Sequence, residues 1–182
     1  MGKRRTARER ALQVLFELEF NDTSPAEVLA AQWKTTPAAD DVRAYAEWLV
    51  RSVVERRAEI DSRIQATSRN WRIVRMTPVD RNVLRLAVLE MLEEKPALAP
   101  AIVINEAIEI ARRFSGEESA VFVNGVLDAV RKNFEKKNGI QKDKDHEPRP
   151  SPAPPLRKAP GAARGRKRAP ADRPGAGPRR KI

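Results

Sequence analysis

Apolar residues recur every three or four positions over most of the first 138 residues, which is the period of helices with one buried face. Sustained alternation of apolar and polar residues, the pattern of half-buried strands, does not occur. Prolines stand where these helices should begin or end. The pattern predicts helices at residues 6–20, 25–33, 40–67, 79–93 and 101–114, a short segment at 69–75, and a last helix that ends near residue 136.

These elements predict an all-α fold of about seven helices in two packed antiparallel sub-bundles. Ser24 and Thr77, each followed by Pro, mark two helix starts, because Ser or Thr caps a helix and Pro suits its first position. Thr6 and Glu9 have the spacing of a capping box, which places the start of the first helix at residue 6.

The positive charge of the chain is concentrated at its end. The 182 residues carry a formal net charge of +11. Residues 139–182 hold 13 Lys and Arg against 4 Asp and Glu, whereas residues 1–138 hold 23 against 21. This tail is rich in Pro and has no apolar periodicity, so that ordering it would lose entropy without burying surface. The sequence therefore predicts a helical domain at 1–138 and a disordered Pro/Ala/Arg/Lys-rich tail at 139–182.

Composition excludes several kinds of chemistry. The chain has no Cys, which excludes disulfides, zinc ribbons and thiol catalysis. Its single His, His146, lies in the tail, so a Ser-His-Asp triad or a His-based metal site cannot form. Five carboxylates could be an acid/base pair or metal ligands, but they occupy positions typical of helix surfaces and caps, without a Gly-rich phosphate loop. They are Glu106, Glu109, Glu117, Glu118 and Asp128. We expect no enzymatic activity, no cofactor and no metal.

The sequence also predicts a cytoplasmic protein without membrane contact. No apolar run approaches the roughly 20 residues that cross a bilayer. Glu17 and Glu19 interrupt the apolar stretch behind the basic N-terminus, unlike the apolar region of a secretory signal.

The basic N-terminus is the first candidate binding site. Five cations and one Glu lie in the first ten residues, and the cations are Lys3, Arg4, Arg5, Arg8 and Arg10. Cations are disfavoured at a helix N-terminus, so they do not serve helix stability. Phe16 and Phe20 continue down the helix from that face, and cations followed by aromatics suit the phosphates and bases of single-stranded RNA. The alternative is a solubilising terminus with both Phe side chains in the core.

The tail is the second candidate. Its clusters at 164–168 and 179–181 would neutralise phosphates without sequence preference, and the alternative is a solvated extension. Two further features indicate packing. Gly125 lies inside a predicted helix, where Gly costs about 1 kcal/mol relative to Ala, and a close helix crossing is the simplest reason for it. The tryptophans Trp33, Trp48 and Trp71 are expected in the core or between the sub-bundles.

Four segments of the domain carry longer motifs. They read RERALQVLF at 8–16, DRNVLRLA at 80–87, INEAIEIA at 104–111 with Phe114 shortly after, and ESAVFVNGVLD at 118–128. In this order, over about residues 4–134, they resemble the NusB family of bacterial transcription antitermination factors. The resemblance implies a fold of two helical sub-bundles, in agreement with the helical pattern.

The resemblance also implies a function. NusB-like proteins bind the boxA element of nascent ribosomal RNA leader transcripts together with NusE, a small-subunit ribosomal protein. The complex helps RNA polymerase, with other Nus factors, to read through terminators. By position, the implied RNA-binding residues are Lys3, Arg4, Arg5, Arg8, Gln13, Phe16 and Phe122. The implied NusE-facing residues are Asp80, Phe114, Glu118 and Phe122. Some members pair through helix faces, so a homodimer is also compatible with the resemblance.

This sequence departs from the family pattern in three places. Phe16 stands where members often have Tyr, which removes a hydroxyl. Val74 and Arg75 stand where acidic residues are expected, so part of the NusE contact has a different charge here. The long basic tail is not a family feature.

Two alternatives remain beside the boxA-binding factor. A non-specific nucleic-acid-binding protein would be driven by the tail. An enzyme is the other, because NusB-like domains also occur fused to ribosomal RNA methyltransferases. That reading needs an α/β domain with a Gly-rich strand-to-helix turn, which this sequence lacks.

Overall fold

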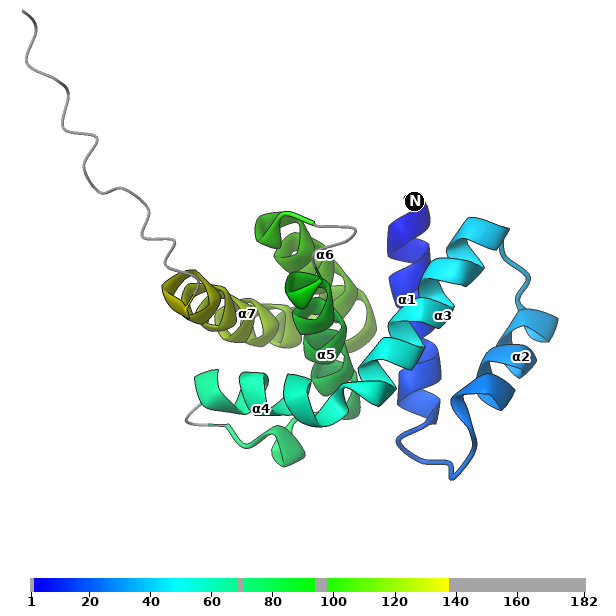
Figure 1. The fold of residues 1–182 in the computed structure, drawn as a ribbon, viewed down its shortest axis with the longest axis horizontal. Coiled ribbons are helices and arrows are strands. Elements are labelled where there is room, and N and C mark those ends of the chain that lie inside the picture. The colour runs from blue at the N-terminus through cyan, green and yellow to red at the C-terminus, as the bar shows by residue number, and fades with distance from the viewer. Residues whose placement is uncertain (1, 69–70, 94–97, 138–182) are drawn as a thin grey trace, which may run out of the picture. The chain divides into compact units, whose positions relative to one another are not determined.

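The computed structural model describes residues 2–68, 71–93 and 98–137, and every regular element within these ranges is a helix. The elements are α1 (Lys3–Glu17), α2 (Pro25–Thr35), α3 (Asp40–Glu55), α4 (Arg57–Thr67), the 3-10 turn η1 (Ile73–Arg75), α5 (Pro78–Leu92), α6 (Pro100–Ser115) and α7 (Glu117–Lys137). Helices α1 to α3 pack together, as do α4 to α7, and α5 also contacts α1 and α3 (Figure 1). The predicted all-α fold with two helical sub-bundles is confirmed.

These helices belong to the compact unit Met1–Asp143. The predicted division at 138 and 139 and the predicted disorder of the tail lie outside the described residues. None of the helices in the described ranges is both long and apolar enough to cross a membrane.

Helix α5 forms the centre of the core. Residues 82–90 are all buried, because apolar side chains occupy most of the circumference of this helix. Helices α1, α3, α4, α6 and α7 all contact it. Leu84 and Leu89 are fully buried, and burying one Leu side chain stabilises a fold by about 1.5–3 kcal/mol. The charged residues Arg85 and Glu90 are buried on the same helix and therefore require partners.

Two predicted helix starts are confirmed. Ser24 forms a capping box with Glu27 at the start of α2. Thr77 Oγ1 accepts a hydrogen bond from the N–H of Asp80 at 3.1 Å at the start of α5. In both helices Pro occupies the first turn, where its missing N–H leaves no bond unmade.

The predicted start of α1 at Thr6 is wrong. The helix begins at Lys3, because the N–H of Thr6 donates to the carbonyl of Gly2 at 3.1 Å and extends the helical ladder upstream. The expected side-chain cap is absent from this start. The first helical turn therefore carries the cations Lys3, Arg4 and Arg5 on rigid backbone.

The predicted single helix at 40–67 is also wrong, because it is two helices separated at Arg56. The backbone of Arg56 leaves the helical region (φ −102°, ψ 17°), and its side chain binds Glu59 and Glu93. Helix α3 packs in the first sub-bundle and α4 in the second. The break changes the direction of the chain, so that the apolar face of α3 packs in one sub-bundle and that of α4 in the other. The predicted short segment at 69–75 contains η1.

Two expectations about packing are wrong. Trp33 is buried and Trp48 is half-buried, but 58% of the Trp71 surface is exposed. A Cβ built on Gly125 would meet nothing within 4 Å, so no helix crosses closely there. Gly116, by contrast, has φ +98° where α6 ends, a conformation that favours glycine.

Candidate nucleic-acid interface

The first turn of α1 presents three cations, which we call the basic arm (Lys3, Arg4 and Arg5). Lys3 is exposed and pairs with an acidic residue on α3 at 2.7 Å. Arg5 donates from Nε and Nη2 to the two carboxylate oxygens of Glu106, each at 2.8 Å. This pairing raises the pKa of Arg5 and lowers that of Glu106. The Arg4 guanidinium is exposed and lies 5.8 Å from the centre of the Tyr45 ring.

Arg8 lies one turn further along α1, but the structure places it in the interior. Its Nε donates to both carboxylate oxygens of Glu90 at 2.9 and 3.0 Å, and its Nη1 lies 3.4 Å from Glu106 Oε2. The Tyr45 hydroxyl also donates to Glu90. Burial, followed by the hydrogen bond to Glu90 and its charge, raises the pKa of Tyr45 above the usual range, which keeps the phenol a donor. Arg8 thus joins α1 to α5 and α6 instead of presenting a cation with the basic arm.

A surface pocket of about 340 Å³ lies between the start of α1 and α6. Three guanidinium side chains and one carboxylate line it, and the exposed Ile102 forms part of its wall. The lining residues are Gly2, Arg4, Arg5, Arg8, Leu98, Ile102 and Glu106. Arg5 and Arg8 are paired with Glu106 and Glu90, so the exposed Arg4 supplies the excess positive charge, which suits a phosphate group.

A second, largely apolar groove of about 300 Å³ lies further along α1, where that helix meets α5 and α6. Its lining residues are Leu12, Gln13, Phe16, Val79 and Phe114. Phe16 is 40% exposed and its ring centre lies 5.0 Å from that of Phe20, which is also exposed. The alternative that both Phe side chains belong to the core is therefore wrong. Gln13 is exposed at the rim and accepts hydrogen bonds from Arg10 and Gln32.

The residues expected to face a protein partner are not all on one surface. Asp80 is buried, and its Oδ1 has no hydrogen-bond partner within the described ranges. Phe114 is half-buried in the groove and Glu118 is exposed on α7. Phe122 is half-buried and meets Trp71 edge-on, with ring centres 6.0 Å apart and planes at 72°. The exposure of Trp71 was not predicted, although the polar residues around it in the sequence were a signal.

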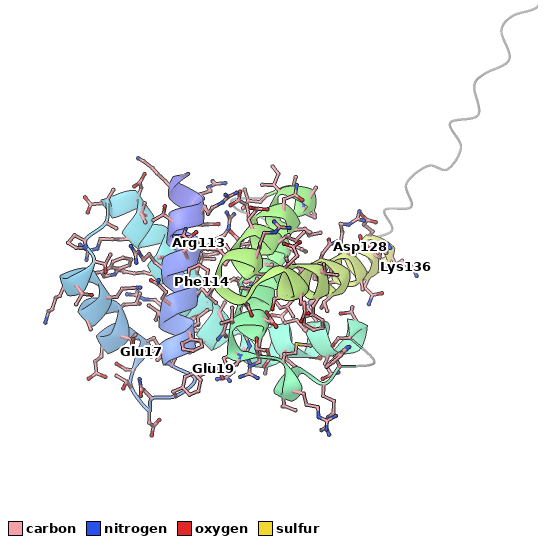
Figure 2. All side chains as sticks on the ribbon, turned by 180° about the vertical axis from the view of Figure 1, so that it is seen from behind. Glu17, Glu19, Arg113, Phe114, Asp128 and Lys136 are labelled. Atoms are coloured by element: carbon pink, nitrogen blue, oxygen red, sulfur yellow. The ribbon has the colours of Figure 1, made fainter. Side chains whose placement is uncertain are left out.

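A buried polar network holds the other end of α1. Arg85 donates to Asp61 at 2.8 Å and to Glu19 at 2.7 Å, and Arg81 donates to Glu19 at 2.8 Å. Burial opposes the charged form of Glu19, but Arg81 and Arg85 lower its pKa. Figure 2 shows Glu19 at one end of α1 and Phe114 beside the middle of that helix, where Phe114 and α1 line the groove. The network was not predicted, because its members are far apart in sequence.

The interface has donors for anions and open aromatic surface, but no metal site. Among the described residues, no group of three or more His, Cys, Asp or Glu side chains could hold a metal ion. Cations hold phosphates in position, while aromatic and amide side chains contact bases. The arrangement is therefore chemically suited to binding a nucleic-acid strand.

Comparison with known proteins gives close relatives. The model of the NusB family matches residues 5–132. The transcription antitermination protein NusB of Sorangium cellulosum is 46% identical over 134 residues, which cover 74% of this chain and 95% of that protein. The protein of the same name from Myxococcus xanthus is 45% identical over 134 residues, covering 71% and 95%.

Solved structures agree with these relatives. NusB in a crystal structure of the antitermination factors NusB and NusE in complex with dsRNA superposes with a TM-score of 0.65 at 30% identity, covering 73% of this chain and 98% of that one. NusB of T. maritima superposes with the same TM-score at 34% identity, covering 72% and 92%. The family model covers α5, α6 and all of α1 except its first two residues, so Lys3 and Arg4 of the basic arm lie outside the match. The chain therefore belongs to the NusB family of transcription antitermination proteins, which makes it a regulator of transcription and not an enzyme.

Proposed function

We propose that this protein binds the boxA element of nascent ribosomal RNA leader transcripts together with NusE, and so helps RNA polymerase with other Nus factors to read through terminators. It would act on transcripts in the cytoplasm. The observation that carries the proposal is that the basic arm and the exposed Phe16 groove both lie along α1, the arm in its first turn and the groove in its second half. A relative that was crystallised with NusE and dsRNA supports it.

The two parts of this surface have separate roles in the proposal. Lys3, Arg4 and Arg5 hold phosphates, which positions the strand without reading its sequence. Gln13 and Phe16 contact bases in the groove, where the amide hydrogen-bonds and the ring stacks. Arg8 acts as a positioning residue, because its pairing with Glu90 keeps the first turn of α1 against α5.

The NusE contact is proposed at the far side of the groove. Phe114 and Phe122 offer half-buried rings, and Glu118 offers an exposed carboxylate between them in sequence. Asp80, which is buried, contributes by shaping the start of α5. One stacked base stabilises a complex by roughly 1–3 kcal/mol, so α1 by itself gives modest affinity, and a partner that extends the RNA surface raises it. A homodimer stays a prediction.

The decisive experiment compares RNA binding of the full chain and of a variant that lacks residues 139–182. Each is titrated with boxA-like RNA and with the same nucleotides in shuffled order, with and without NusE. We expect a preference for boxA-like RNA that survives removal of the tail and increases with NusE. Equal affinity for both RNAs in every mixture would overturn the proposal. Loss of all RNA binding with the tail would instead identify a non-specific binder driven by charge.

A further inference from the structure

Trp71 is an exposed indole that the proposed function does not use. It is 58% exposed just before η1, and Val74 within η1 is 70% exposed. An aromatic side chain that stays in water does not contribute the free energy that its burial would give to the fold. An exposed apolar patch on a protein domain frequently marks an interaction site. The core of the second sub-bundle does not use this side chain.

The contact between Trp71 and Phe122 leaves aromatic surface open. The ring planes meet at 72° with centres 6.0 Å apart, so the edge of one ring faces the other. In this geometry the ring that presents its edge keeps both of its own faces free of its neighbour. A planar group such as a nucleobase can therefore stack beside Phe122 without displacing either side chain.

The segment around Trp71 also carries two positive charges that no neighbouring carboxylate of the described ranges neutralises. Arg72 and Arg75 are exposed, and within the described ranges neither forms an ion pair. This differs from Arg8 and Arg85, whose guanidinium groups are buried and paired with carboxylates. Free guanidinium groups beside an open indole face match the alternating phosphates and bases of a single strand.

This segment leads along the chain to the groove that holds Phe16. Arg75 lies four residues before Val79, which lines the groove on α5. Phe122 lies on α7, which packs against α6, and α6 contributes Phe114 to the same groove. The groove and the Trp71 segment therefore lie on neighbouring elements of the fold.

We infer that Trp71, Arg72 and Arg75 form a second nucleotide-binding element, the Trp71 platform, in which Trp71 stacks a base that flanks the boxA element and the two Arg side chains neutralise its phosphates. The inference rests on the proposed function. The occupant is RNA and not a protein segment, because two unpaired cations favour a polyanion. The platform extends the bound strand from α1 across to the second sub-bundle.

The test uses the full chain and two RNAs: a boxA-like oligonucleotide and the same oligonucleotide with a uridine tract at each end. Trp71→Ala should weaken binding of the extended RNA by about fivefold or more, whereas Trp71→Phe should retain most of the affinity because a ring remains. Arg72→Ala/Arg75→Ala should weaken it too, and should lower the slope of log affinity against log salt by about 0.7 for each lost phosphate contact.

The matched controls are Val54→Ala, which removes another exposed apolar side chain, and Lys34→Ala/Arg51→Ala, which removes two exposed cations elsewhere. Both should bind the extended RNA as the unaltered chain does. Thermal unfolding confirms that each variant is folded, which the exposure of the altered side chains predicts.

The outcomes separate this inference from the proposed function. If Trp71→Ala binds the extended RNA normally while boxA-like RNA is still preferred over shuffled RNA, the platform is overturned and the proposed function stands. If Trp71→Ala loses only association with NusE, the face is a protein contact and the RNA inference is overturned. If the unaltered chain shows no preference for boxA-like RNA, the proposed function has failed, and the boxA-flanking role of the platform fails with it.

Discussion

The Nε atom of Arg8 lies 2.9 Å from a carboxylate oxygen of Glu90, and both side chains are more than nine-tenths buried. The pair joins the first helix of the chain to the central helix of the core. A guanidinium group that sequence alone places with the basic arm is thus part of the structural interior. The pair holds the basic arm at a defined position above the pocket that the arm lines.

Replacing Arg8 with Ala should lower the free energy of unfolding by about 3–5 kcal/mol, because it leaves the charge of Glu90 buried without its counter-ion, with the Tyr45 hydroxyl still donating to it. Arg4→Ala, which removes an exposed cation one turn earlier, should leave that free energy nearly unchanged. Urea denaturation followed by circular dichroism measures both.

The double variant Arg8→Met/Glu90→Met distinguishes a lost ion pair from a lost contact. Removing both charges should restore much of the stability that Arg8→Met loses, because no uncompensated charge stays in the core. If the effects of the two single variants simply add, the pair is not coupled and this account is wrong.

Replacing Arg4 and Arg5 together with Ala should weaken binding to boxA-like RNA at least about tenfold and flatten its salt dependence, since two phosphate contacts are lost. Filter-binding titrations at several salt concentrations measure both effects. Unchanged affinity would show that the basic arm does not hold the RNA.

Replacing Phe114 and Glu118 together with Ala should impair association with NusE, because the variant removes a half-buried ring and an exposed carboxylate from the proposed contact. A pull-down with purified NusE checks this, with Asp128→Ala on α7 as the control for loss of a carboxylate outside the contact. Normal recovery of NusE by the double variant would reject the proposed surface.

The paired carboxylates predict a fold that loses stability in acid. The hydrogen bond with Arg5 and the charges of Arg5 and Arg8 hold the pKa of Glu106 below its ordinary 4.5. Burial raises the pKa of Glu19, but the hydrogen bonds and charges of Arg81 and Arg85 outweigh burial and lower this pKa. Unfolding therefore binds protons, so this stabilisation is complete above pH 4.5 and is lost as the pH falls through the folded-state values.

The urea concentration at the midpoint of unfolding, measured from neutral pH downward, should decrease once the pH drops below 4.5. Glu106→Gln should be less stable at neutral pH and less sensitive to acid, since its side chain no longer titrates. Midpoints that stay constant down to the lowest pH would contradict the role of these pairs.

Replacing Gly125 with Ala should stabilise the protein by about 1 kcal/mol, because Ala favours a helix and the added Cβ meets no atom within 4 Å. Calorimetric melting should give a higher Tm. The same change at Gly116, whose φ is +98°, should lower it. A lower Tm for Gly125→Ala would mean that the face around residue 125 is occupied.

Some of the candidate site could be predicted from local features of the chain. The position of Phe16 on the first helix follows from helical spacing, and its exposure agrees with the RNA-binding alternative. The placement of the basic arm on the same helix was not predicted, because the expected start at Thr6 lies after it. The break at Arg56 could not be predicted, because an apolar seam continues through it and only the separate packing of α3 and α4 requires the turn.

The sequence by itself determined which segments are helical and which face of most helices is buried, because a repeat of three and four residues is a local property of the chain. It also determined the family. Only the tertiary structure decided what each charged or aromatic side chain does. Arg8 and Glu90 are 82 positions apart, and Arg5 and Glu106 are 101 apart, so their pairing depends on how helices pack and not on any local pattern. The same reason placed Trp71 at the surface, since its burial depends on which elements reach it.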